Sequence, residues 1–153
     1  MNRKKRWILS SAGVVLALLL ILGLWWLHGG PLLWTQRQFA AHRVAFEATA
    51  EAALAGEPWK DVPGVRNLNV WPKEGAEDVQ LADFTTGAWG LGSSTLYWGI
   101  YCTTDGGPAG FQGTDMVLTE DAVGEYSWQE EDGDNHYKTW CLEDGWYGYL
   151  MEF

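Results

Sequence analysis

One apolar segment near the start of the sequence constrains the architecture more than any other feature. Residues 7–27 form a run of 21 residues without a charged side chain or a proline, and 12 of them are Leu, Ile or Val. As a helix this run would be roughly 31 Å long, which matches a bilayer hydrocarbon core of about 30 Å. Trp7 at one end and Trp25 and Trp26 at the other suit the two interfacial belts. We therefore predict one transmembrane helix over residues 7–27, with the lipid bilayer as its partner.

The charges before this segment predict its orientation. The tail of residues 1–6 carries four cations and no acid: Arg3, Lys4, Lys5 and Arg6. Such cations stay cytoplasmic, so the rest of the chain is predicted to lie outside the plasma membrane. A removable signal peptide is the alternative, but the apolar run exceeds the usual length of about 7–15 residues and no small-residue cleavage site follows it. An uncleaved signal-anchor is therefore favoured.

The part of the chain after the apolar segment is strongly acidic. It holds all 20 acidic residues and six of the ten basic residues, which gives it a formal charge of −14. This charge repels both a phosphate backbone and an anionic lipid surface. We therefore exclude nucleic acid as a partner and disfavour docking on anionic lipid.

Composition divides this acidic part into a helical and a β-rich region. Residues 28–31 contain a Gly-Gly-Pro breaker, and residues 32–56 are rich in helix-forming Ala, Gln, Arg and Glu. Apolar side chains there recur at intervals of three, four and seven, which predicts an amphipathic helix. Its stripe could cover a sheet or pair with another helix, and covering a sheet is favoured. The stripe consists of Phe39, Phe46, Ala50, Ala53 and Leu54.

Residues 57–153 are rich in Trp, Tyr, Thr, Gly and Asp, which favours strands and turns. Short spacings and an Asp-Gly turn at 144–145 indicate antiparallel hairpins. The glycine-rich stretch 87–92 is interpreted as a flexible connection, because its G-x-x-G-x-G spacing reverses a dinucleotide fingerprint. The predicted class is α+β, with a helix against an antiparallel meandering sheet. The predicted strands are 65–71, 79–84, 94–102, 115–119, 125–129, 136–143 and 146–153.

The two cysteines, Cys102 and Cys141, both follow the apolar segment. Outside the cytoplasm a disulfide is permitted, and closing this loop would contribute roughly 4 kcal/mol. The alternative is two thiols that never meet. We predict a disulfide, because both residues lie in predicted strands.

No motif predicts a metal, a cofactor or a catalytic centre. A calcium loop starting at Asp132 would place Tyr137 where an EF-hand requires glycine, so the acidic run 130–135 is better interpreted as a solvated hairpin turn. The histidines are scattered, and no Gly-x-Ser-x-Gly sequence surrounds a serine. Paired carboxylates are numerous, but an acidic surface produces them in any case.

Eight tryptophans follow the apolar segment. Most are expected in the core of so small a domain, because aromatic side chains are its largest apolar groups. Trp59 and Trp89 lie in loop-like contexts and are the better candidates for an exposed platform on which a sugar ring stacks.

Four short aromatic motifs resemble a group of small single-pass membrane proteins of Gram-positive bacteria. These proteins share a basic start, one span and an aromatic C-terminal strand, and the resemblance implies this topology without implying an activity. Cys102 and Cys141 depart from the group, which has aromatic or aliphatic residues there. The motifs are 97–101 (Tyr-Trp-Gly-Ile-Tyr), 111–115 (Phe-Gln-Gly-Thr-Asp), 134–136 (Asp-Asn-His) and 146–149 (Trp-Tyr-Gly-Tyr).

The order of a membrane helix, an amphipathic continuation and a sheet is also similar to type IV pilins and pseudopilins. Their processing site, a glycine followed by an aromatic residue and a glutamate five residues on, is absent. The likeness is one of shape only.

Three functions are therefore compatible with the sequence. The leading one is a non-catalytic interaction module at the cell envelope that binds another envelope protein, or itself, through the helix of residues 32–55 and the nearby sheet. The second is a module that binds a cell-wall glycan through Trp59 or Trp89. The third is a hydrolase with paired carboxylates.

Overall fold

The computed structural model of this chain describes residues 13–24, 30–91 and 94–153. Within the predicted span of residues 7–27, residues 13–24 are helical, and the rest of the span lies outside the described residues. The four cations Arg3, Lys4, Lys5 and Arg6 also lie outside them. In the part of the chain that is described, no helix is long and apolar enough to cross a membrane.

The described fold after residue 30 consists of a long helix and a seven-stranded antiparallel sheet, which confirms the predicted α+β class. Helix α2 (Gly30–Leu54) matches the predicted amphipathic helix of residues 32–56 but begins and ends two residues earlier, so that Gly30 and Pro31 of the predicted breaker belong to its first turn. Its path changes at His42, where φ is −127° and ψ is 20°. The strands are β1 (Asn67–Pro72), β2 (Gln80–Leu91), β3 (Ser94–Thr103), β4 (Thr119–Ala122), β5 (Glu125–Gln129), β6 (His136–Glu143) and β7 (Trp146–Glu152).

The sheet is not one continuous meander, which corrects the predicted topology. Its strand order is β1-β2-β3-β7-β6-β5-β4, so two meanders meet where β7 pairs with β3. The segment between β3 and β4, which contains the short helix η1 (Phe111–Gly113), passes over the sheet to connect them. The last strand of the domain therefore stands at the centre of the sheet.

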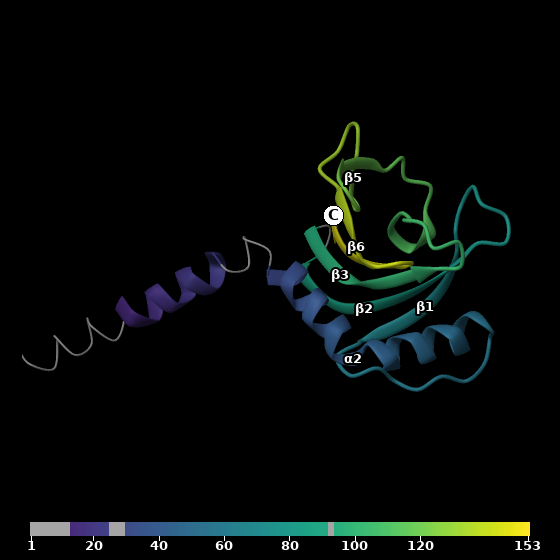
Figure 1. The fold of residues 1–153 in the computed structure, drawn as a ribbon. Coiled ribbons are helices and arrows are strands. Elements are labelled where there is room, and N and C mark those ends of the chain that lie inside the picture. The colour runs from purple at the N-terminus through teal and green to yellow at the C-terminus, as the bar shows by residue number, and fades with distance from the viewer. Residues whose placement is uncertain (1–12, 25–29, 92–93) are drawn as a thin grey trace, which may run out of the picture.

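Helix α2 covers one face of the sheet, as the apolar stripe predicts (Figure 1). Phe46 is fully buried and meets Phe84 of β2 at a ring-centroid distance of 5.0 Å. Phe39 meets Trp146 of β7 at 5.2 Å. Arg43 forms an ion pair with Glu143, which fastens the helix to the end of β6. The stripe is thus occupied by the sheet of its own domain.

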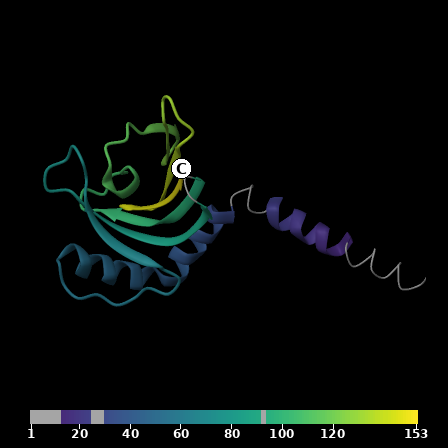
Figure 2. The ribbon, with the colours of Figure 1, turned by 180° about the vertical axis from the view of Figure 1, so that it is seen from behind.

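The opposite face of the sheet packs against the segment that carries η1, as the view from behind also shows (Figure 2). Phe111 of η1 meets Tyr149 of β7 at 5.7 Å. The Tyr101 hydroxyl accepts a hydrogen bond from the Ala109 amide at 3.0 Å, and the Tyr137 hydroxyl donates to the Ala109 carbonyl at 3.0 Å. Two buried phenols therefore hold the covering segment in place.

Glycine lies directly opposite an aromatic residue at three positions in the sheet. The pairs are Gly87 with Trp98, Gly99 with Tyr149, and Gly148 with Trp140. A Cβ atom added to any of these glycines would lie within 2.1 to 2.6 Å of the opposing ring. Each ring therefore lies flat across its glycine and covers strand backbone that a side chain would otherwise cover.

This pairing explains why β2 is longer than predicted. The sequence indicated a strand that ends at Phe84 and a flexible connection over 87–92, because isolated glycines weaken a strand. Instead β2 continues to Leu91, with a bulge between Thr85 and Gly87. The Trp98 ring fills the space above Gly87 and makes the extension stable. The fourth strand was also misplaced, since 119–122 pairs with β5 in place of 115–119.

Candidate functional site

A groove lies on the face of the sheet that α2 covers, beyond the first turn of that helix. Its cavity volume is about 570 Å³, within the range of small-molecule sites. We call it the Trp89 groove. It is lined from α2 by Pro31 and Leu32, from β2 and β3 by Trp89, Ser94, Thr95 and Leu96, from β4 and β5 by Asp121, Glu125 and Tyr126, from β6 by Lys138, Thr139 and Trp140, and from the end of the domain by Leu150, Glu152 and Phe153.

The register of the strands explains why these residues meet. Side chains of directly opposed residues in an antiparallel pair share a face of the sheet. Trp89 opposes Leu96, and Leu96 in turn opposes Glu152. Lys138 opposes Leu150, and Trp140 opposes both Gly148 and Glu125. The groove is therefore one row of side chains that runs across the sheet where α2 leaves it uncovered.

The floor of the groove is an aromatic ring. The Trp140 indole lies across Gly148, where an added Cβ would be 2.5 Å from the ring. Because the ring lies flat on the sheet, it presents a face rather than an edge to the groove. Its indole nitrogen is buried and has no hydrogen-bond partner among the described residues. An unpaired buried donor is uncommon in a protein core, because it lowers the stability of the fold by about 1–3 kcal/mol.

Trp89 forms a wall of the groove and is 68% exposed. The sequence placed it in a loop, whereas it lies near the end of β2. Trp59, the other predicted platform, is 46% exposed but lines a separate cavity of about 190 Å³ between the end of α2 and β1. No described residue lines both cavities. The two tryptophans therefore belong to different surfaces.

Polarity changes from one end of the groove to the other. Beside the start of α2 the lining is apolar, with Leu32 and Leu96, and Leu150 lies next to Lys138 nearer the middle of the sheet. Across the sheet, at β4 to β6, it carries Asp121, Glu125 and Lys138, and Glu152 adds a third carboxylate on β7. The lining thus has three carboxylates and one ammonium group. Such a site favours an uncharged or cationic ligand with one apolar side.

The predicted disulfide is not formed in this structure. Both cysteines are free, with Cys102 buried and Cys141 exposed. Cys102 opposes Trp146 and Cys141 opposes Tyr147, two neighbours on β7 whose side chains point to opposite faces. Two strand spacings separate the cysteines by roughly 10 Å, beyond the Cα separation of about 7 Å that a bridge can span. The spacing of the cysteines along the sequence does not indicate that β7 lies between the two strands that carry them.

Asp83 is a buried carboxyl group that the sequence analysis missed. It is 1% exposed, and no hydrogen bond reaches either carboxylate oxygen among the described residues. Burial raises its pKa to about 6, which the nearby Tyr149 hydroxyl and Trp71 indole only partly offset. The sequence signal that could have revealed it is an acidic residue within the otherwise apolar run 81–84. Because Asp83 opposes Tyr101, it lies on the face away from the groove.

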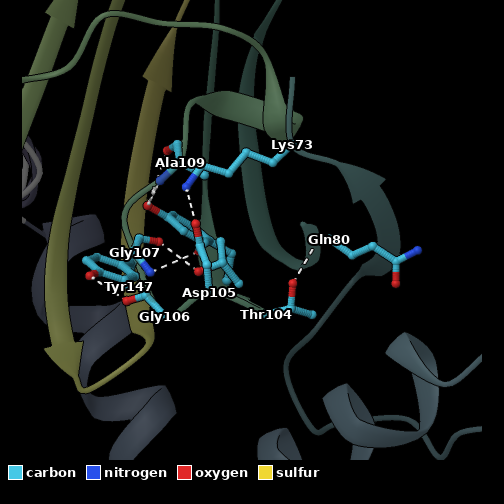
Figure 3. A network of polar contacts seen from close by, with 10 residues as sticks. Lys73, Gln80, Thr104, Asp105, Gly106, Gly107, Ala109 and Tyr147 are labelled. Atoms are coloured by element: carbon cyan, nitrogen blue, oxygen red, sulfur yellow. Dashed lines mark hydrogen bonds and ion pairs between the residues drawn. The ribbon is translucent and has the colours of Figure 1, made fainter. Parts of the chain in front are cut away.

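The segment after β3 is held by a polar network rather than arranged as a second site (Figure 3). Lys73 donates to Asp105 at 2.8 Å, and Asp105 accepts from the Gly107 amide at 3.0 Å. Although partial burial opposes the shift, the hydrogen bond from Lys73 lowers the pKa of Asp105. The Tyr147 hydroxyl donates to the Gly106 carbonyl at 3.1 Å. The bond from Lys73 ties the segment to the residue after β1, the bond from Tyr147 ties it to β7, and the Gly107 bond lies within the segment.

The acidic turn of residues 130–135 joins β5 to β6 and is largely exposed. Within 13–24, 30–91 and 94–153, no three His, Cys, Asp or Glu side chains are grouped so that they could hold a metal ion. Comparison of the chain with models of known families, with curated proteins and with solved structures gives no match. The groove therefore has to be interpreted from its own residues.

Proposed function

We propose that the protein is a membrane-anchored, extracytoplasmic and non-catalytic binding module that holds a carbohydrate in the Trp89 groove. The anchor and its orientation rest on the apolar run of residues 7–27 and the cations before it. The binding role rests on one observation: an exposed indole, Trp89, and a flat indole floor, Trp140, share a groove with carboxylates. Aromatic faces cover the apolar side of a sugar ring, and carboxylates accept hydrogen bonds from its hydroxyl groups.

Protein interaction through α2 loses its main support. The stripe that would have met a partner is buried on the sheet, where Phe39 and Phe46 pack against β2 and β7. Val44 is 77% exposed on the outer side of the helix, but single exposed apolar residues are ordinary. A protein partner would therefore have to use another surface.

Hydrolysis by paired carboxylates is also less well supported than binding. Asp83, whose pKa is raised by burial, lies on the other face of the sheet and cannot act as a general acid in the groove. The groove carboxylates Asp121, Glu125 and Glu152 are better interpreted as hydrogen-bond acceptors for a bound ligand.

The proposal is tested by titrating the full-length protein, held in a nanodisc, with soluble oligosaccharides cut from bacterial cell walls. Trp89→Ala should weaken binding at least tenfold, or about 1.4 kcal/mol, because it removes a central aromatic contact. Trp59→Ala is the matched control, since it removes another exposed tryptophan away from the groove, and it should change little. Equal losses in both variants, or no binding of any saccharide by the wild type, would refute the proposal.

A further inference from the structure

The Trp89 groove has an apolar end and a polar end, and their order along the sheet is fixed. The apolar end lies at the start of α2, with Leu32 and Leu96. The polar end lies over β4 to β6, with Asp121, Glu125 and Lys138. A free oligosaccharide has no apolar chain to place against Leu32 and Leu96. A molecule with an apolar chain joined to a sugar matches both.

The apolar end is also the end nearest the apolar helix of residues 13–24. Six Cα–Cα steps join Leu24 to Gly30, which limits their separation to about 22 Å. Pro31 and Leu32, which line the groove, follow at once. If residues 7–27 span a bilayer, the apolar end of the groove is held close to its outer surface. A site tethered there meets lipids at a far higher local concentration than it meets distant polymer.

The charges of the lining restrict the head group. Three carboxylates, Asp121, Glu125 and Glu152, accompany the single cation Lys138. A phosphate or sulfate would be repelled by this excess of negative charge. An uncharged sugar would be accepted, because its hydroxyl groups donate to carboxylates.

We propose that the Trp89 groove binds a neutral glycolipid of the outer leaflet, with the sugar over β4 to β6 and the lipid chain beside Leu32 and Leu96. This inference rests on the proposed function and names the ligand of the same site. The sugar stacks on the Trp140 indole, and Trp89, which opposes Leu96 on the neighbouring strand, covers the start of the lipid chain. The first part of the lipid chain leaves the groove past the start of α2 towards the bilayer.

The test uses the full-length protein in nanodiscs of phosphatidylcholine that contain a minor fraction of a glucosyl diacylglycerol. The protein is extracted into mild detergent, and retained lipid is quantified by native mass spectrometry. Wild type and Trp59→Ala should retain the glycolipid, whereas Trp89→Ala should retain at least tenfold less. Leu96→Asn, which makes the apolar end polar, should reduce retention of the glycolipid similarly. Near-UV circular dichroism confirms that each variant is folded.

The other outcomes separate this inference from the proposed function. If soluble sugar binds in a Trp89-dependent way but glycolipid is not retained, the inference fails and the proposed function stands. If neither ligand depends on Trp89, both fail. If phosphatidylglycerol replaces the glucosyl lipid and is retained equally well, the groove takes adventitious lipid and the inference is overturned.

Discussion

Gly99 illustrates how single residues determine the packing of this sheet. It lies in β3 opposite Tyr149, whose ring crosses the glycine so that its hydroxyl meets the Thr85 hydroxyl at 3.2 Å. An isolated glycine in an apolar run weakens the prediction of a strand at that position. The strand over 94–102 was nevertheless predicted, because β-branched and aromatic residues surround Gly99. Which ring covers a given glycine depends on the pairing partner, and sequence alone did not reveal it.

Gly99→Ala should destabilise the fold by about 1–3 kcal/mol or more, because overpacking forces ring and backbone apart. The added Cβ would lie 2.4 Å from the Phe84 carbonyl oxygen and 2.6 Å from the Tyr149 ring. Urea unfolding of the full-length protein, followed by near-UV circular dichroism, measures the change. Gly107→Ala is the control, because its Cβ would have only ordinary contacts from 3.6 Å outward. Equal stability of the two variants would contradict the packing described for Gly99.

Asp83 makes stability depend on pH in an identifiable direction. Its folded pKa of about 6 lies above the ordinary value of 3.8, so the folded state holds the proton more tightly than the unfolded state. Asp83 therefore contributes most to the free energy of unfolding below about pH 4, and this contribution is lost as the pH rises towards 6 and above. Asp83→Asn should remove this loss and be more stable than wild type near pH 7, by roughly 2–3 kcal/mol. The difference between their urea midpoints, measured from about pH 4 to about pH 8, isolates Asp83 from other carboxyl groups; a constant difference would exclude it.

At the scale of elements, local patterns predicted most of what is observed. Strands β5 and β6 have the predicted bounds, and the Asp-Gly turn before β7 joins a hairpin as expected. The apolar stripe of α2 packs against the sheet, as predicted. Residues 104–118 were harder, because their only regular structure is η1 and their position depends on distant hydroxyl groups.

Tyr101→Phe should loosen that segment. It removes the acceptor of the Ala109 amide, and an unpaired buried donor costs about 1–3 kcal/mol. The Ala109 amide should then exchange its hydrogen faster, which hydrogen-exchange mass spectrometry of this segment measures. Tyr147→Phe, which removes a half-exposed bond to the Gly106 carbonyl, should have a smaller effect. If exchange at Ala109 is unchanged, the buried phenol does not hold the segment.

For the whole molecule, the candidate site could be predicted only in part. Exposure of Trp59 and Trp89 was anticipated from their surroundings in the sequence, and both are exposed. Trp140, Lys138 and Glu152 could not be added, because they meet Trp89 only through the insertion of β7 between β3 and β6. The order of strands is a long-range property that local patterns do not specify.

The two cysteines differ in solvent exposure, so labelling of their thiols tests both the proposed orientation and the order of the strands. Burial raises the pKa of Cys102 to about 12, so its thiol stays protonated and unreactive, while Cys141 is exposed. A membrane-impermeant maleimide added to intact cells should add one label at Cys141, and denaturation without reductant should expose a second site. Labelling only after the cells are broken would contradict the proposed orientation. Labelling only after reduction would show a disulfide and contradict the sheet order.

The central position of β7 has a consequence for biosynthesis. The strand that joins the two meanders is the last of the seven to leave the ribosome, so the two halves of the sheet cannot be joined until it has been made. Pairing of such distant segments is also slow. The nascent domain therefore cannot complete its fold while it is being made, and an incompletely folded chain suits a translocation channel.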